Sequence, residues 1–188
     1  MKKILIILLI SIFTFTGCQN LKNTPTSKVE EFLSNYQRLD NNVVEELDNI
    51  ISQDSNMTEE QQSEYKRLLE KQYQNLSYKI TNEEIKGSKA TVDVEIEVYD
   101  YETAISNSEK RYLENQDKSS EDKDNNSMEE IEEEIEEISN YIDYKLEEMD
   151  KVTSKKKYML TIELTKEKGI WKIEKLTEAD LKKIHGLF

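Results

Sequence analysis

Nucleophilic or metal chemistry would depend on the few histidine and cysteine side chains of this chain. His185 is the only histidine and Cys18 the only cysteine among 188 residues. A catalytic triad needs a firmly positioned imidazole, and His185 lies close to the C-terminal end, where chains tend to fray. Zinc sites draw on several histidine or cysteine ligands. The sequence therefore predicts no catalytic residue, no metal site and no cofactor, and His185 is interpreted as a surface or helix-end side chain.

Carboxylates are abundant, with 40 Asp and Glu, but their spacing selects no pair for general acid–base work. Three of them, Asp93, Glu95 and Glu97, alternate along one predicted strand, where we interpret them as a solvated face. Tyr99 and Tyr101 follow on the same side of that strand. These two tyrosines are candidates for a ligand or partner surface, and edge packing under the acidic helix predicted at 129–152 is the alternative.

Four residues match ligand positions one, three, five and twelve of an EF-hand calcium loop: Asp122, Asp124, Asn126 and Glu133. The sixth position of such a loop needs glycine, and this chain has Ser127 there. We therefore expect only diffuse cation association with the Glu-rich segment 129–137, in which divalent ions would relieve like-charge repulsion along a helix.

The first 18 residues follow the pattern of an export signal. Lys2 and Lys3 precede an apolar run from Ile4 to Phe15, which spans roughly 18 Å as a helix, against the roughly 30 Å hydrocarbon core of a bilayer. A run of this length is typical of a signal peptide. Gly17 and Cys18 follow it.

Phe15-Thr16-Gly17-Cys18 resembles the lipobox of bacterial lipoproteins, although lipoboxes prefer Leu where this chain has Phe15. The resemblance implies cleavage after Gly17 and a diacylglyceryl group on Cys18. The chain would then be anchored to the outer face of the cytoplasmic membrane of a Gram-positive type cell. Two acyl chains anchor a protein stably, whereas one binds only marginally. A plain secretory signal or an uncleaved anchor is the alternative.

The charge of the chain argues against nucleic-acid binding. Removing residues 1–17 takes away two lysines and no acid, so 24 basic and 40 acidic side chains give the mature chain a formal charge of −16. An acidic surface repels nucleic acid and anionic lipid head groups. With Cys18 lipidated, no thiol remains for a disulfide, and the exported part must fold by burial alone.

We expect three parts: a signal peptide at 1–17, a lipidated tether at 18–26, and one domain at 27–188. A capping box at Ser27–Glu30 is expected to begin an amphipathic helix that extends to Ile51. Asn41-Asn42 either divide this segment into two helices or leave it as one. A second helix follows a capping box at Thr58–Gln61.

Alternating apolar residues then predict two antiparallel hairpins. The first has its turn at Lys86-Gly87-Ser88, the second has its turn at Lys166–Gly169, and Thr177 is expected to cap a final helix. Between the hairpins we expect an insertion at 107–152. It consists of a mobile polar loop from Asn107 to Ser127 and an acidic helix at 129–152, which packs on the sheet, forms its own domain, or binds a partner through an exposed apolar stripe.

This order of elements resembles the small cystatin-like and nuclear-transport-factor-2-like domains. The segments that carry the resemblance are Val29–Tyr36, Ile85–Val92 and Lys166–Ile173. It implies a curved antiparallel sheet of about four strands around the first helix, with a concave face that can form a pocket. No catalytic motif of such domains is recognisable here.

The predicted fold is therefore α+β, with two to four helices. The leading functional hypothesis is a membrane-anchored, non-enzymatic binding or accessory module at the cell surface, whose protein partner would meet the helix at 129–152. The second is a small-ligand-binding protein that uses the concave face, and the third is an enzyme on this fold.

Overall fold

A computed structural model describes residues 23–52, 55–116 and 127–188, except for the side chains of 114–116 and 127–136. The elements in chain order are α1 (Pro25–Arg38), α2 (Asn41–Ser52), α3 (Glu59–Gln74), β1 (Ser77–Lys86), β2 (Lys89–Tyr99), α4 (Tyr101–Gln116), α5 (Ser127–Asp150), β3 (Lys155–Glu167), β4 (Ile170–Ile173) and α6 (Glu178–His185). The fold is α+β, as predicted, with six helices among the described residues instead of two to four.

The four strands form one open antiparallel sheet in the order β1-β2-β3-β4. Every second residue of β2 from Ala90 to Val98 is buried, and β3 repeats this pattern from Tyr158 to Leu164. Because β2 pairs with β3 over its whole length, the two strands present one continuous apolar face. The predicted alternation and both predicted hairpins are confirmed.

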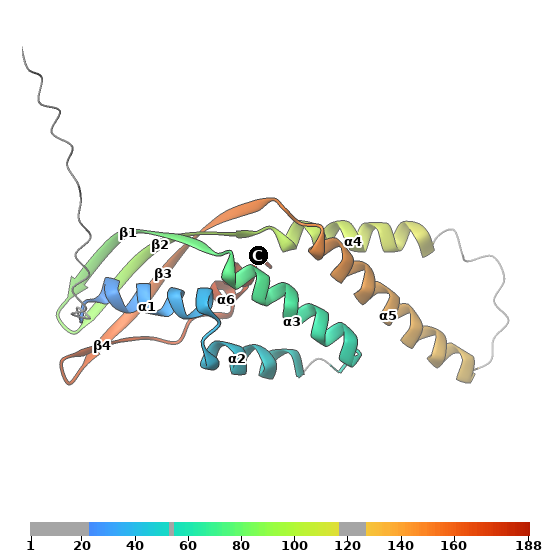
Figure 1. Cartoon of the computed structure of the whole chain (residues 1–188), viewed down its shortest axis with the longest axis horizontal. Coiled ribbons are helices and arrows are strands. Elements are labelled where there is room, and N and C mark those ends of the chain that lie inside the picture. Colours follow the sequence, from blue (N-terminus) through green and yellow to red (C-terminus); the bar gives the residue numbers. More distant parts are fainter. Residues whose placement is uncertain (1–22, 53–54, 117–126) are drawn as a thin grey trace, which may run out of the picture.

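Helices cover that apolar face (Figure 1). Val29 and Leu33 of α1 are wholly buried against it, and Tyr36 is 4% exposed. The same core takes in residues from α2, α3 and α6, namely Val43, Leu47, Ile51, Leu69, Tyr73 and Ile184. Each fully buried aliphatic side chain contributes roughly 1.5–3 kcal/mol, so α1 is fixed to the sheet, and side chains fill the space beneath it.

The first helix begins earlier than predicted. Thr24 is the N-cap: its hydroxyl accepts a hydrogen bond from the backbone of Ser27, whose hydroxyl in turn accepts from the backbone of Thr24. Pro25 stands at the first helical position, where its missing N–H leaves no bond unmade. Ser27 is therefore not the N-cap, and Pro25 and Thr26 belong to the helix instead of the tether.

The other helix boundaries largely follow the sequence. Leu39 has a left-handed backbone (φ 53°) and ends α1, and α2 begins at Asn41, so the interruption of the long helix is confirmed. The capping box at Thr58–Gln61 and the cap at Thr177 are also confirmed.

The insertion forms two helices where one was predicted. The segment from Asn107 to Gln116 is the second half of α4, so the prediction of a polar loop is wrong there. The acidic helix is α5. We call α4 and α5 together the helical arm. It begins at Tyr101 and extends beyond the sheet toward the end opposite the start of α1 (Figure 1).

Candidate binding surfaces

The chain enters the domain at a fixed place. Asn23 donates its side-chain amide to the carbonyl of Gly169 at 2.6 Å and accepts from the backbone of Trp171 at 3.1 Å. The backbone and hydroxyl of Thr26 both donate to the carboxylate of Glu83. Asn23 is thereby bonded to the β3–β4 hairpin, and Thr26 to β1. Both hairpin turns and the start of α1 lie at one end of the molecule, the tether end (Figure 1). Gly17 and Cys18 lie outside the described residues.

The two candidate tyrosines have different surroundings. Tyr101 is wholly buried and donates its hydroxyl to the carbonyl of Leu68 at 3.0 Å, and burial raises its pKa. Tyr101 lines no surface, because the chain turns into α4 after Asp100. The alternative, packing under the acidic helix, is confirmed for it, since it clusters with Ile142 and Met149 of α5. Tyr99 is half-buried, with the ammonium groups of Lys71 and Lys155 at 5.7 and 5.4 Å from its ring centre. Cation–π contacts of this kind and stacking on the ring of Tyr101 at 6.0 Å hold the Tyr99 ring in place.

The apolar stripe of α5 is covered over part of its length. Ile142, Leu146 and Met149 are buried against α4 and α3 in a second core that also contains Tyr101 and Ala104. Toward the far end, Leu113 of α4 is 58% exposed and Ile138 of α5 is 40% exposed. The helix therefore packs on the helical layer instead of the sheet, and the arm keeps exposed apolar side chains near its outer end.

A polar groove of about 840 Å³ separates α3 from α5. Gln61, which is 5% exposed, donates to the carbonyl of Ser139 at 3.0 Å and to the carboxylate of Asp143 at 2.7 Å. Arg67 lies 2.6 Å from both Glu64 and Asp150 and lowers the pKa of each carboxyl. Glu64 and Asp150 are therefore ionised and paired with Arg67, and contacts across the groove link α3 to α5.

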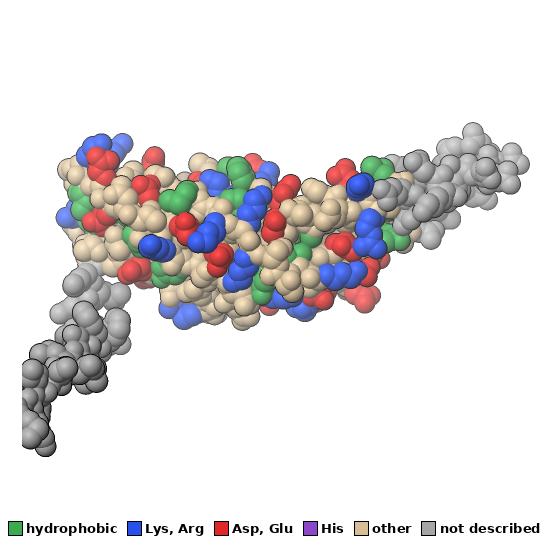
Figure 2. Space-filling model, turned by 90° about the horizontal axis from the view of Figure 1, so that it is seen from above, with side chains coloured by type: hydrophobic (Ala, Val, Ile, Leu, Met, Phe, Trp, Pro, Cys, Tyr) green, Lys and Arg blue, Asp and Glu red, His purple; other side chains and the backbone are tan. Residues whose placement is uncertain are grey.

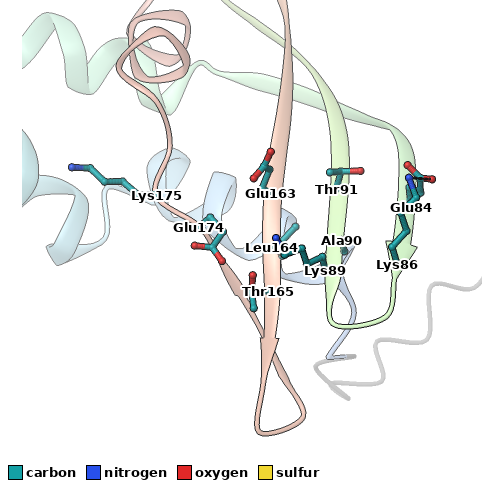
Figure 3. Close-up of a pocket in the computed structure, with 10 residues that line it drawn as sticks. All are labelled: Glu84, Lys86, Lys89, Ala90, Thr91, Glu163, Leu164, Thr165, Glu174 and Lys175. Carbon is teal, nitrogen blue, oxygen red and sulfur yellow. Dashed lines mark ion pairs between the residues drawn. The ribbon is translucent and has the colours of Figure 1, made fainter.

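The open face of the sheet carries a second groove, of about 650 Å³, near the tether end. Glu84, Thr91 and Glu163 rise from three adjacent strands, with Lys86 and Lys89 near the hairpin turn and Glu174 beside β3 (Figure 3). Seen from above, lysines and acids are mixed along the molecule (Figure 2). Acidic and basic side chains are therefore mixed around the groove.

Asp93, Glu95 and Glu97 do lie on this open face, each with a polar partner. Lys157 pairs with Glu95 at 2.8 Å and lowers its pKa, and the hydroxyl of Thr161 donates to Asp93 at 2.7 Å. Cross-strand pairs of this kind stabilise a solvated sheet face, as the sequence indicated.

His185 is a helix-end residue, as predicted, but it packs inward. Its ring lies 5.7 Å from that of Tyr73, and burial lowers its pKa to about 4. The imidazole is neutral at neutral pH and serves packing.

Among the described residues, no helix is long and apolar enough to cross a membrane, and no group of three or more His, Cys, Asp or Glu side chains could hold a metal ion. The EF-hand-like residues Asp122, Asp124 and Asn126 and the side chain of Glu133 lie outside the described part. No protein-family model, curated protein or solved structure matches this chain.

Proposed function

We propose that this chain is an extracytoplasmic lipoprotein, held to the outer face of the cytoplasmic membrane by a diacylglyceryl group on Cys18, and that it acts as a non-enzymatic binding or accessory module. One observation carries the proposal. The chain enters the domain at one end, where Asn23 is bonded to the β3–β4 hairpin, and the helical arm projects from the other end. An anchor at the first end would leave the arm free to meet a partner.

The surface composition of the outer part of the arm favours a protein as the binding partner. Leu113 and Ile138 are exposed apolar side chains, and the segment 129–137 contains seven glutamates. Exposed apolar groups beside charges of one sign mark many protein contact sites. A partner with a basic rim and an apolar centre would complement both features.

The domain type is a further proposal. A helix packed across an antiparallel sheet, with α1 over the strands and the sheet in the order β1-β2-β3-β4, agrees with a cystatin-like or nuclear-transport-factor-2-like domain. In this chain the arm is added between β2 and β3.

A small-ligand-binding function is the alternative, favoured by one apolar recess. It measures about 310 Å³, lies between α1 and the segment that follows β4, and is lined by Phe32, Tyr36, Ile173, Leu176 and Leu181 with Glu46 beside them. That volume is at the lower limit of ligand sites. A discrete adduct retained in native mass spectrometry would favour this alternative over a protein partner.

Photo-crosslinking in living cells tests the binding function. A photoreactive amino acid replaces Leu113 or Ile138 in the full chain, and a matched control carries it at Met159, which is 51% exposed on the open sheet face. We expect discrete protein adducts from the two arm positions and none from Met159. Identical adduct patterns at all three positions, or no adduct from the arm, would contradict the proposal.

A further inference from the structure

The tips of the two hairpins are basic, although Glu83, Glu84 and Glu174 lie just outside them. We define the hairpin tips as residues 86–89 and 166–172, which contain five lysines and one glutamate, whereas the whole chain has a net charge of −14. The two tips lie side by side, because the backbone of Lys166 donates to the carbonyl of Ser88 at 2.7 Å. Their charges therefore act together on whatever faces this end of the molecule.

Several groups at the tips are available to a partner. Lys89 and Lys168 are exposed, and within the described ranges neither takes part in an ion pair, whereas Lys86 pairs with Glu84. Beside them Ile85 and Ile170 are 51% and 54% exposed. Unpaired lysines next to exposed aliphatic side chains are the groups that proteins place at the surface of an anionic membrane.

The short tether brings the tips to the membrane. Only residues 19–22 separate Cys18 from Asn23, and five extended Cα steps span at most about 18 Å. Asn23 is bonded to the β3–β4 turn itself. If Cys18 carries the lipid, as the proposed function requires, the tips stay within reach of the head groups.

The arrangement of charge in the molecule favours the same orientation. At physiological salt the Debye length is about 8 Å, so the acids of the helical arm would be screened from the head groups when the tips face them. The Glu-rich start of α5 lies at the opposite end (Figure 1). We propose that the hairpin tips dock on anionic phospholipid head groups as a second membrane contact, which turns the helical arm away from the membrane.

The single tryptophan provides a probe, because Trp171 lies within the second tip. The lipidated full chain is placed in vesicles of phosphatidylcholine, with or without phosphatidylglycerol, that contain lipids with a nitroxide on the head group. We expect stronger quenching of Trp171 in the anionic vesicles, and we expect added salt to abolish the difference.

Two double variants distinguish the effect of the tip lysines from the effect of the net charge of the chain. Each lysine near an anionic surface shifts the docking equilibrium about fivefold, so Lys89→Gln with Lys168→Gln should weaken docking about 25-fold. The control, Lys79→Gln with Lys151→Gln, removes the same charge away from the tips and should keep the quenching. Equal quenching in both vesicle types, or equal loss in both variants, would overturn the proposal.

Failure of the anchor is distinguishable from failure of the tips. If the mass of the purified chain shows no lipid on Cys18, the proposed anchor is wrong. The chain is then coupled through its Cys18 thiol to a maleimide lipid in the same vesicles, and the quenching of Trp171 still decides whether the tips dock.

Discussion

At the residue scale, two buried residues join the ends of elements that lie far apart in the sequence. Gln72 of α3 is wholly buried, donates to the carbonyl of Tyr99 at 3.1 Å and accepts from its backbone N–H at 2.8 Å. It thus replaces a strand partner at the end of β2, since buried backbone groups need partners. Gly186 packs against the same place, and Glu102 donates its backbone N–H to the carbonyl of Gly186 at 2.8 Å.

Gly186→Ala tests this junction. Gly186 has φ +74°, and a Cβ there would collide with the carbonyl of Tyr99 and the amide of Gln72. Backbone strain and overpacking together predict a loss of about 2–5 kcal/mol in the free energy of unfolding. Gly87→Ala is the matched control, because φ is +65° but nothing lies within 4 Å of the new Cβ. It should cost about 1 kcal/mol. Equal losses in denaturant titrations of the two variants would show that the contact contributes nothing.

One local signal, the helix cap at Asp100, was overlooked because it follows a long run of alternating residues. Alternation along β2 suggested that the strand continued to Tyr101. However, Asp100 accepts from the backbone of Thr103 and caps a helix there. A single capping carboxylate is a weak signal beside a long alternating run, so Tyr101 was a candidate for a surface when it belongs to the core. The hydrogen bonds of Asn23, Gln61 and Gln72 could not be predicted from the sequence. Each joins residues that lie far apart along the chain, and local sequence patterns do not show which distant residues meet.

At the element scale, periodicity and capping residues predicted all four strands and every helix of the described residues but one, with α1 and α2 expected as a single helix that Asn41-Asn42 could interrupt. The exception, α4, buries Tyr101, Ala104 and Ser108 at helical spacing. Two of these side chains are small or polar, so the stripe is faint in the sequence, and contact with α5 supplies the burial that its own composition does not indicate.

Gln61 connects the arm to the rest of the domain, and Gln61→Glu tests that connection. The carboxylate can still accept from the backbone of Thr58 and keep the capping box. It loses the donor to Ser139 and places a negative charge beside Asp143. We expect the local stability of α5 to fall by about 1–3 kcal/mol, measured as faster hydrogen exchange near Ile142, with amides of the sheet unchanged.

Gln74→Glu provides the matched control for this prediction, since Gln74 is an exposed residue of the same helix. It makes the same chemical change without a partner on α5 and should leave exchange in the arm unchanged. Faster exchange spread evenly over the domain in Gln61→Glu would mean that the residue supports the whole fold instead of holding the arm.

At the scale of the whole molecule, the proposed function requires that the two ends of the molecule differ in surface. The tether end gathers the start of α1 and the lysine-rich hairpin tips, and the opposite end carries the acidic, partly apolar arm. Neither the direction of the arm nor the meeting of the tips was accessible from the sequence. The first depends on where α4 leaves the sheet, and the second on the register in which β2 pairs with β3. The proposed export signal, by contrast, is a local pattern that can be recognised from the sequence alone.

The anchor at Cys18 is the central claim, and the mass of the mature N-terminal peptide tests it most directly. Protein isolated from cells should lack residues 1–17 and begin at Cys18, with a diacylglyceryl thioether that disappears in Cys18→Ala as the protein is released from the membrane. An N-terminal peptide that retains Met1, or a Cys18 with a free thiol in membrane-associated protein, would contradict the account.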